Sequence, residues 1–175
     1  MNSGENKKAG PVTHFLLEDH RRLEGLLQSA VAQAGSVDQG TYDQFRAGLL
    51  RHIGMEEKIL LPTAQRLRGG EPLPIASKLR LDHGAIASLL MPPPTASIIA
   101  TIRAVLKVHN TIEEGSGGLY ETCDELACSE SAQLLAKLQA APELAVLPCS
   151  DSPAVMPAVQ RVLERAGYDF CDEKI

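Results

Sequence analysis

The chain has few aromatic residues: its 175 residues include three Phe, three Tyr and no Trp. The core must therefore be built from Leu, Ile, Val and Ala, which favours helices packed on helices. The chain also lacks a run of about 18 apolar residues, which a membrane-spanning helix requires. Its length suits one domain with a terminal extension.

Basic clusters and cysteine motifs are missing as well. The net charge is −5 and no basic stripe is present, so we expect no nucleic-acid partner. The first residues are polar and no apolar segment follows them, so we expect a soluble, cytoplasmic protein without membrane association. The cysteines form no C-x-x-C pair, and we expect reduced thiols without a metal or redox role at Cys123, Cys128, Cys149 and Cys171.

What the chain does contain is a pattern that occurs twice. The pair Asp19-His20 recurs as Asp82-His83, and the motif His-x-x-x-Glu-Glu at residues 52–57 recurs at residues 109–114. These motifs use every histidine except His14, which falls on the opposite side of the first helix from His20 and should face solvent. A doubled pattern of this kind suits a site with two metals inside a four-helix bundle.

Hydrophobic residues recur at helical spacing around each of the four histidines. Capping-box residues and Gly/Pro clusters mark the ends of these segments, and Pro62 is expected to help end the second one. The predicted helices are one ending near Gly35, one from Thr41 to residue 68, one at about 75–91 and one opening at Thr95 or Ser97.

The sequence therefore predicts an all-α fold whose centre is a four-helix bundle over residues 12–126. A flexible tail over residues 1–11 precedes it, and a C-terminal helical extension over residues 127–175 follows it. Two short helices are expected in the extension, at residues 129–141 and 157–166, the second ended by a glycine.

Carboxylates share the apolar faces with the histidines. Glu56 and Glu113 each follow a histidine by one helical turn, so imidazole and carboxylate project from the same buried face. A buried ionised Glu without a partner costs more free energy than a marginally stable domain can spare. Neither helix places Lys or Arg on its inner face, so a metal dication is the predicted compensation.

The donors divide evenly between two metals, with two histidines for each and both glutamates bridging. Imidazole and carboxylate suit iron, manganese and zinc, whereas structural zinc sites tend to be rich in thiolate. Iron is therefore the preferred metal, and zinc or manganese stays open. The predicted ligands are His20, His52, Glu56, His83, His109 and Glu113.

These motifs resemble the hemerythrin-like, or HHE cation-binding, family, in its four-His, two-Glu type. The resemblance rests on the two Asp-His pairs and the two His-x-x-x-Glu-Glu motifs with Leu61-Pro62 and Leu119-Tyr120 after them, and covers about residues 13–126. It implies an up-down-up-down bundle that holds two iron ions with oxo and carboxylate bridges. It also implies roles in binding or sensing O2, nitric oxide or peroxide, in oxidative or nitrosative stress, or in iron handling.

One position departs from hemerythrin itself. Hemerythrin has a fifth histidine one turn after the third-helix ligand, and this chain has Ala87 there, so one iron should keep an open position for a small diatomic ligand or peroxide. Glu57 and Glu114 are expected to be solvated helix residues rather than ligands. Tyr120 lies three turns beyond His109, roughly 16 Å along a continuous helix, and should be too far away to bind a metal.

Our leading hypothesis is a non-haem di-iron protein that binds or senses a small ligand. A second hypothesis is an oxidoreductase that reduces O2, peroxide or nitric oxide, although the sequence shows no separate general acid or substrate pocket. A third is a metal-binding bundle that acts as an interaction module through residues 127–175. Catalytic residues and the oligomeric state do not follow from the sequence.

Overall fold

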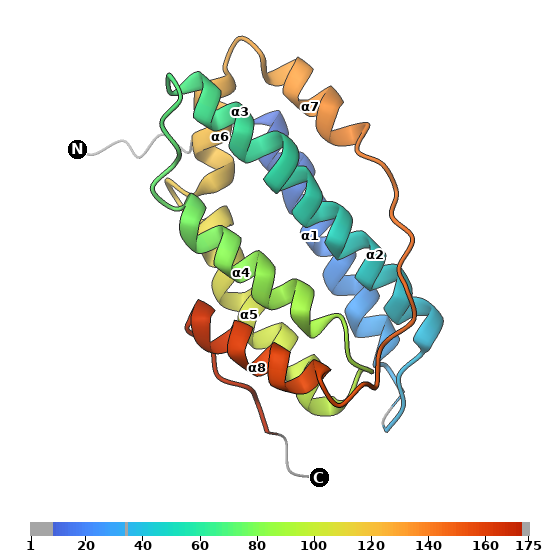
Figure 1. Ribbon diagram of the computed structural model, residues 1–175. Coiled ribbons are helices and arrows are strands. Elements are labelled where there is room, and N and C mark those ends of the chain that lie inside the picture. Colours follow the sequence, from blue (N-terminus) through green and yellow to red (C-terminus); the bar gives the residue numbers. More distant parts are fainter. Residues whose placement is uncertain (1–8, 34, 173–175) are drawn as a thin grey trace, which may run out of the picture.

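The computed structural model describes residues 9–33 and 35–172. Within these residues the regular elements are all helical, and the longest of them pack side by side as a bundle (Figure 1). The predicted all-α bundle with a C-terminal helical extension is confirmed. The flexible tail predicted for residues 1–11 falls largely outside the described residues, and the first helix begins at Pro11. No helix in the described parts of the chain is long and apolar enough to cross a membrane.

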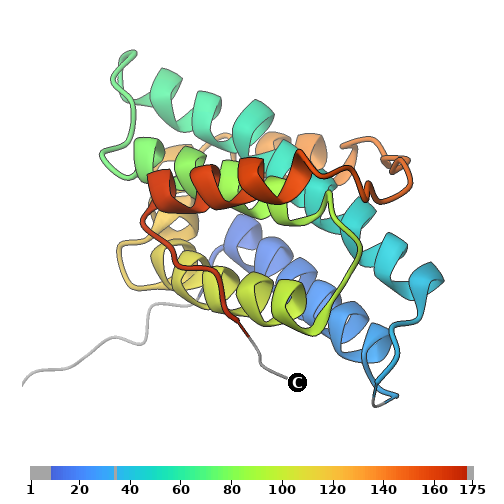
Figure 2. The same cartoon turned by 60° about the horizontal axis from the view of Figure 1, so that its bottom comes forward.

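Successive segments of the bundle run in alternating directions, as an up-down-up-down topology requires (Figure 1). The segments are α1 (Pro11–Ala30); α2 (Gln39–Met55), continued by the π-helical turn η1 (Glu56–Leu60) and by α3 (Leu61–Leu67); α4 (Ala76–Leu89); and α5 (Ala96–Glu114), followed by α6 (Leu119–Ala127). In the extension, α7 (Ser131–Gln139) packs beside α1, and α8 (Val155–Ala166) covers the outer side of α4 (Figure 2).

Side-chain caps fix the start of two bundle helices. Asp38 caps α2 by accepting a hydrogen bond from the backbone N–H of Thr41 at 2.7 Å, so Thr41 is the donor and not the capping residue. Thr95 caps α5, as predicted, by accepting from the N–H of Ile98 at 3.2 Å. Each cap satisfies one of the free N–H groups of the first helical turn.

The second bundle helix ends at Leu67, in agreement with the predicted end by residue 68, but Pro62 lies within the helix and does not help to end it. Proline lacks an N–H group, and in an α-helix its ring clashes with the carbonyl group four residues earlier. Here the N–H of Leu61 binds the carbonyl oxygen of Glu56, five residues back, and this wider π turn accommodates the ring. The π turn begins at Glu56, and such turns are frequent at functional sites.

The apolar core consists of two clusters. One cluster fills the end of the bundle that α8 covers and contains Phe45, Ile86 and Ile102. The other fills the opposite end, beside α6 and α7, and contains Leu16 and Leu79. A layer of buried polar side chains lies between the two clusters, at the level of the predicted metal ligands.

Candidate metal centre

The predicted ligands converge in this middle layer, although they come from four separate bundle segments. Their side chains are at most 4% exposed, except that of His20, which is 9% exposed. The contributions are His20 from α1, His52 from α2, Glu56 from η1, His83 from α4, and His109 and Glu113 from α5. The remaining histidine, His14, is exposed, as predicted.

The two glutamates lie between two pairs of histidines, and each directs one oxygen toward each pair. On one side, Glu56 Oε1 lies 3.3 Å from His52 Nε2, and Glu113 Oε2 lies 3.5 Å from His20 Nε2. On the other side, Glu56 Oε2 lies 3.1 Å from His83 Nε2, and Glu113 Oε1 lies 3.0 Å from His109 Nε2. Two carboxylates that bridge a pair of metals need this arrangement.

Several of these buried atoms have no hydrogen-bond partner among the described residues. They are Glu56 Oε2, His83 Nε2 and Glu113 Oε1, which face one another in the second half of the site. Polar atoms in a protein interior are rarely left without a partner, because losing water without gaining a hydrogen bond destabilises the folded state. A cation among them would satisfy all three, so the donor set fits a metal ion. One ligand atom from each of these residues and from His109 lies within 4.8 Å of the others.

Each imidazole turns its other ring nitrogen, Nδ1, toward a second carboxylate. Such a partner keeps the proton on Nδ1, leaves Nε2 free to bind a metal and fixes the ring orientation. The Nδ1-to-oxygen distances are 2.5 Å for His20 and Glu114, 2.8 Å for His52 and Asp19, 2.6 Å for His83 and Glu57, and 3.5 Å for His109 and Asp82.

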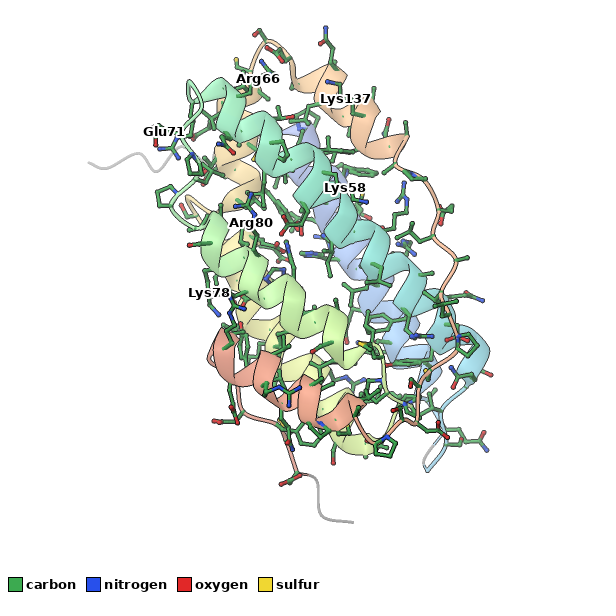
Figure 3. All side chains as sticks on the ribbon, viewed as in Figure 1. Lys58, Arg66, Glu71, Lys78, Arg80 and Lys137 are labelled. Carbon is green, nitrogen blue, oxygen red and sulfur yellow. The ribbon has the colours of Figure 1, made fainter. Side chains whose placement is uncertain are left out.

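This outer ring of carboxylates corrects one prediction. Glu57 and Glu114, expected to be solvated helix residues, are hydrogen-bonded to imidazoles. Arg80 of α4, labelled in Figure 3, also donates to Glu57 at 3.3 Å. The repeat contains these outer carboxylates in both copies: an Asp precedes His20 and His83, and a second Glu follows Glu56 and Glu113. The prediction failed because Glu57 and Glu114 lie one position off the apolar face of their helices, where a side chain is expected to face solvent.

The carboxylates also alter the protonation of the imidazoles. Burial alone disfavours the charged form of His52, but the charge of Glu56 and the hydrogen bond to Asp19 raise its pKa to about 10. Burial likewise opposes charge on His83 and His109, yet their carboxylate partners raise the pKa to about 10 and about 9. In the metal-free protein, imidazolium charges therefore balance the buried carboxylates at neutral pH.

The position of Tyr120 contradicts the prediction that this residue lies too far from the centre to bind a metal. Its hydroxyl oxygen is 3.0 Å from His20 Nε2, 3.1 Å from His52 Nε2, 2.8 Å from Glu56 Oε1 and 3.1 Å from Glu113 Oε2. Neighbouring donor atoms around one octahedral metal, each bound at about 2.1 Å, lie about 3.0 Å apart. The hydroxyl group therefore stands where a fifth donor to the first half of the site would stand. Burial and the charges of Glu56 and Glu113 raise the pKa of the phenol well above its usual range.

A glycine-rich turn brings Tyr120 to this position. The fourth bundle helix is not continuous: α5 ends at Glu114 and α6 begins at Leu119. Gly117 has a φ of 71°, and a Cβ atom on Gly118 would lie 2.6 to 2.7 Å from three backbone carbonyl oxygens. Only glycine tolerates both conditions without strain. The tight turn shortens the path along the bundle axis, so the distance calculated for a continuous helix does not apply.

The comparisons with known proteins agree with this geometry. The family model described as the hemerythrin HHE cation binding domain matches residues 12–141. Searches of curated proteins and of solved structures found no match. The match spans most of the chain, including every helix that contributes to the His/Glu cluster. The chain therefore belongs to the hemerythrin HHE cation-binding family.

Proposed function

We propose that this protein is a non-haem di-iron protein that binds or senses O2, nitric oxide or peroxide. The observation that carries the proposal is the placement of Glu56 and Glu113, whose oxygens divide between two histidine pairs. Two bridged iron ions held there would supply the affinity for small diatomic molecules and peroxide. Imidazole and carboxylate donors suit iron, and within the described residues the cluster contains no thiolate.

The two halves of the site offer different numbers of donors. His20 and His52 have Tyr120 beside them, whereas no such group stands beside His83 and His109 among the described contacts. The residue one turn after His83 is Ala87, whose methyl group is too short to bind a metal. We therefore assign the open coordination position, and with it the small ligand, to the half that holds His83 and His109.

A cavity of about 240 Å³ lies against the most exposed of the six predicted ligands, His20. Leu23, Phe45 and Leu106 form apolar walls, and the exposed residues Arg103 and Lys107 lie at its rim. This cavity adjoins the half of the site that holds Tyr120, so a small neutral or anionic molecule that enters here would have to pass His20 to reach the half with the open position. The apolar clusters block approach along the bundle axis.

Optical spectra with iron quantitation test the proposal. Protein loaded with ferrous iron under anaerobic conditions should hold about two irons per chain. On exposure to O2 it should develop the near-ultraviolet charge-transfer bands of a bridged ferric pair. Retention of one iron or none under ample iron would refute the di-iron assignment. Continued consumption of O2, peroxide or nitric oxide with a reductant would favour the oxidoreductase alternative over binding or sensing.

Adjacent glutamates should respond differently to the same substitution. Glu56→Gln removes a proposed bridging ligand, so the variant should lose at least one metal. Glu57→Gln leaves an amide oxygen that can accept from His83 Nδ1 but removes the negative charge that pairs with His83 and Arg80. It should therefore keep the full stoichiometry with an affinity about 10- to 100-fold lower. Metal titration of the two variants, with bound metal counted by elemental analysis, measures both effects. An identical loss of metal in the two variants would show that the assignment of Glu56 as the ligand and Glu57 as the outer partner is wrong.

Tyr120→Phe tests the proposed fifth donor. If the phenol oxygen binds ferric iron, the oxidised protein should show a visible phenolate-to-iron charge-transfer band, and the variant should lose it while retaining its iron. The matched control is Tyr42→Phe, because Tyr42 is also fully buried but belongs to the apolar cluster beneath α8. A visible spectrum that is the same in the wild type and in Tyr120→Phe would exclude Tyr120 as a ligand.

Metal affinity should increase with pH. Metal binding must displace protons from His52, His83 and His109, whose pKa values of about 10, 10 and 9 keep them protonated at neutral pH. Each displaced proton raises the apparent affinity by about tenfold per pH unit below these pKa values. Competition of Co(II) between the protein and a chelator, from pH 6.5 to 8.5, measures the slope. His14→Gln, a change at an exposed site, should leave the slope unchanged, and a flat profile in the wild type would contradict the assignment.

A further inference from the structure

The two repeats hold their aspartates in different ways. In the first repeat, Arg22 of the same helix donates to Asp19 Oδ1 at 2.8 Å, and the Arg22 side chain is 47% exposed. In the second repeat, Lys78 donates to Asp82 Oδ1 at 2.6 Å. Lys78 also donates to the carbonyl oxygen of Ala166 at 3.0 Å and to the hydroxyl group of Tyr168 at 3.3 Å. Its ammonium group lies 4.4 Å from the centre of the Tyr168 ring.

These additional contacts come from the C-terminal segment, residues 155–172, which lies beyond the part of the chain that matches the family. The buried face of α8 packs on α4, and Gly167, with a φ of 86°, turns the chain back so that Tyr168 meets Lys78. Figure 3 shows Lys78 where the C-terminal end of α8 meets the first part of α4. Further on, the backbone N–H of Cys171 donates to Thr101 Oγ1 on α5 at 3.0 Å. The segment is therefore tied to the two helices that carry His83 and His109.

Asp82 connects this segment to the metal centre. Its side chain is fully buried, with Oδ1 bound by Lys78 and Oδ2 directed at His109 Nδ1. The Oδ2-to-Nδ1 distance is 3.5 Å, and neither atom has another hydrogen-bond partner in the described residues. The other three imidazoles approach their carboxylates to between 2.5 and 2.8 Å. Among the four imidazoles, His109 therefore makes the weakest contact to its outer carboxylate, and its orientation depends most on the position of that carboxylate.

We propose that the C-terminal segment positions one half of the metal centre. Lys78, fixed by Ala166 and Tyr168, holds Asp82 so that its free oxygen faces His109, which keeps the proton on Nδ1 and directs Nε2 to the metal. Lys78 and Tyr168 are thus positioning residues that act through Asp82. The inference rests on the proposed di-metal centre, and it gives residues beyond the family match a role in setting the properties of that centre.

Substitution of the two cations that hold the aspartates provides a matched test. Lys78→Met should release Asp82 and affect His109, whereas Arg22→Met should release Asp19 and affect His52. The metal-free protein is measured at about pH 11, above the pKa values of about 9 for His109 and about 10 for His52, so that both imidazoles are neutral. Long-range ¹H–¹⁵N spectra then show which nitrogen of each imidazole carries the proton. The wild type should show His109 protonated on Nδ1, and Lys78→Met should show a mixture of both forms at His109 alone. Tyr168→Phe, which keeps the ring but removes the hydroxyl group, should produce a smaller change at the same histidine.

Titration with Co(II) gives the second readout. Two Co(II) ions should bind in two steps, and Lys78→Met should lower the affinity of one step by about tenfold and leave the affinity of the other unchanged. Unchanged helical circular dichroism in each variant establishes that the fold is intact, and Lys78→Arg should restore the wild-type spectra. A folded Lys78→Met protein with an unaltered His109 spectrum, or with both steps weakened equally, would overturn the inference. Failure of the wild type to bind two metals would refute the di-metal proposal instead, because the imidazole spectra require no metal.

Discussion

The burial of Glu56 and Glu113 is the constraint on which the rest of the structure depends. Both side chains are fully excluded from solvent between two apolar clusters, where an ionised carboxylate requires a compensating positive charge. The histidines supply that charge as imidazolium groups in the metal-free protein, and metal dications can replace it. The outer carboxylates pair with each Nδ1. They hold the imidazole rings in one orientation, which is needed in the metal-free protein and in the metal-bound protein.

The repeat in the sequence gives the centre an approximate twofold symmetry, but its two halves are not equivalent. The first half has the Tyr120 hydroxyl group beside its predicted donors and a cavity beside His20, whereas the second half has Ala87 one turn after His83. The cations that hold Asp19 and Asp82 also differ, since only Lys78 is fixed by the C-terminal segment. Two metals in such a site would have different affinities and reactivities, which suits a protein in which one metal binds the external ligand.

Much of this structure could be predicted from the sequence, because the spacing of histidines and glutamates within helices fixes which faces they share. The all-α bundle and the convergence of the six predicted donors both followed from that spacing. Three features did not follow, and each depends on backbone geometry or tertiary contacts. The π turn at Glu56 carries the helix through Pro62, and the turn at Gly117 and Gly118 returns Tyr120 to the centre. The contact between Lys78 and Tyr168 joins residues far apart in the chain.

Anomalous diffraction from crystals of the iron-loaded protein tests the central claim most directly, because it locates each metal without any assumption about spectra. We expect two iron peaks about 3.5–4 Å apart in the middle layer. One peak should lie between His20 and His52 and the other between His83 and His109, with Glu56 and Glu113 spanning both. A single peak, or iron bound only outside this layer, would contradict the account.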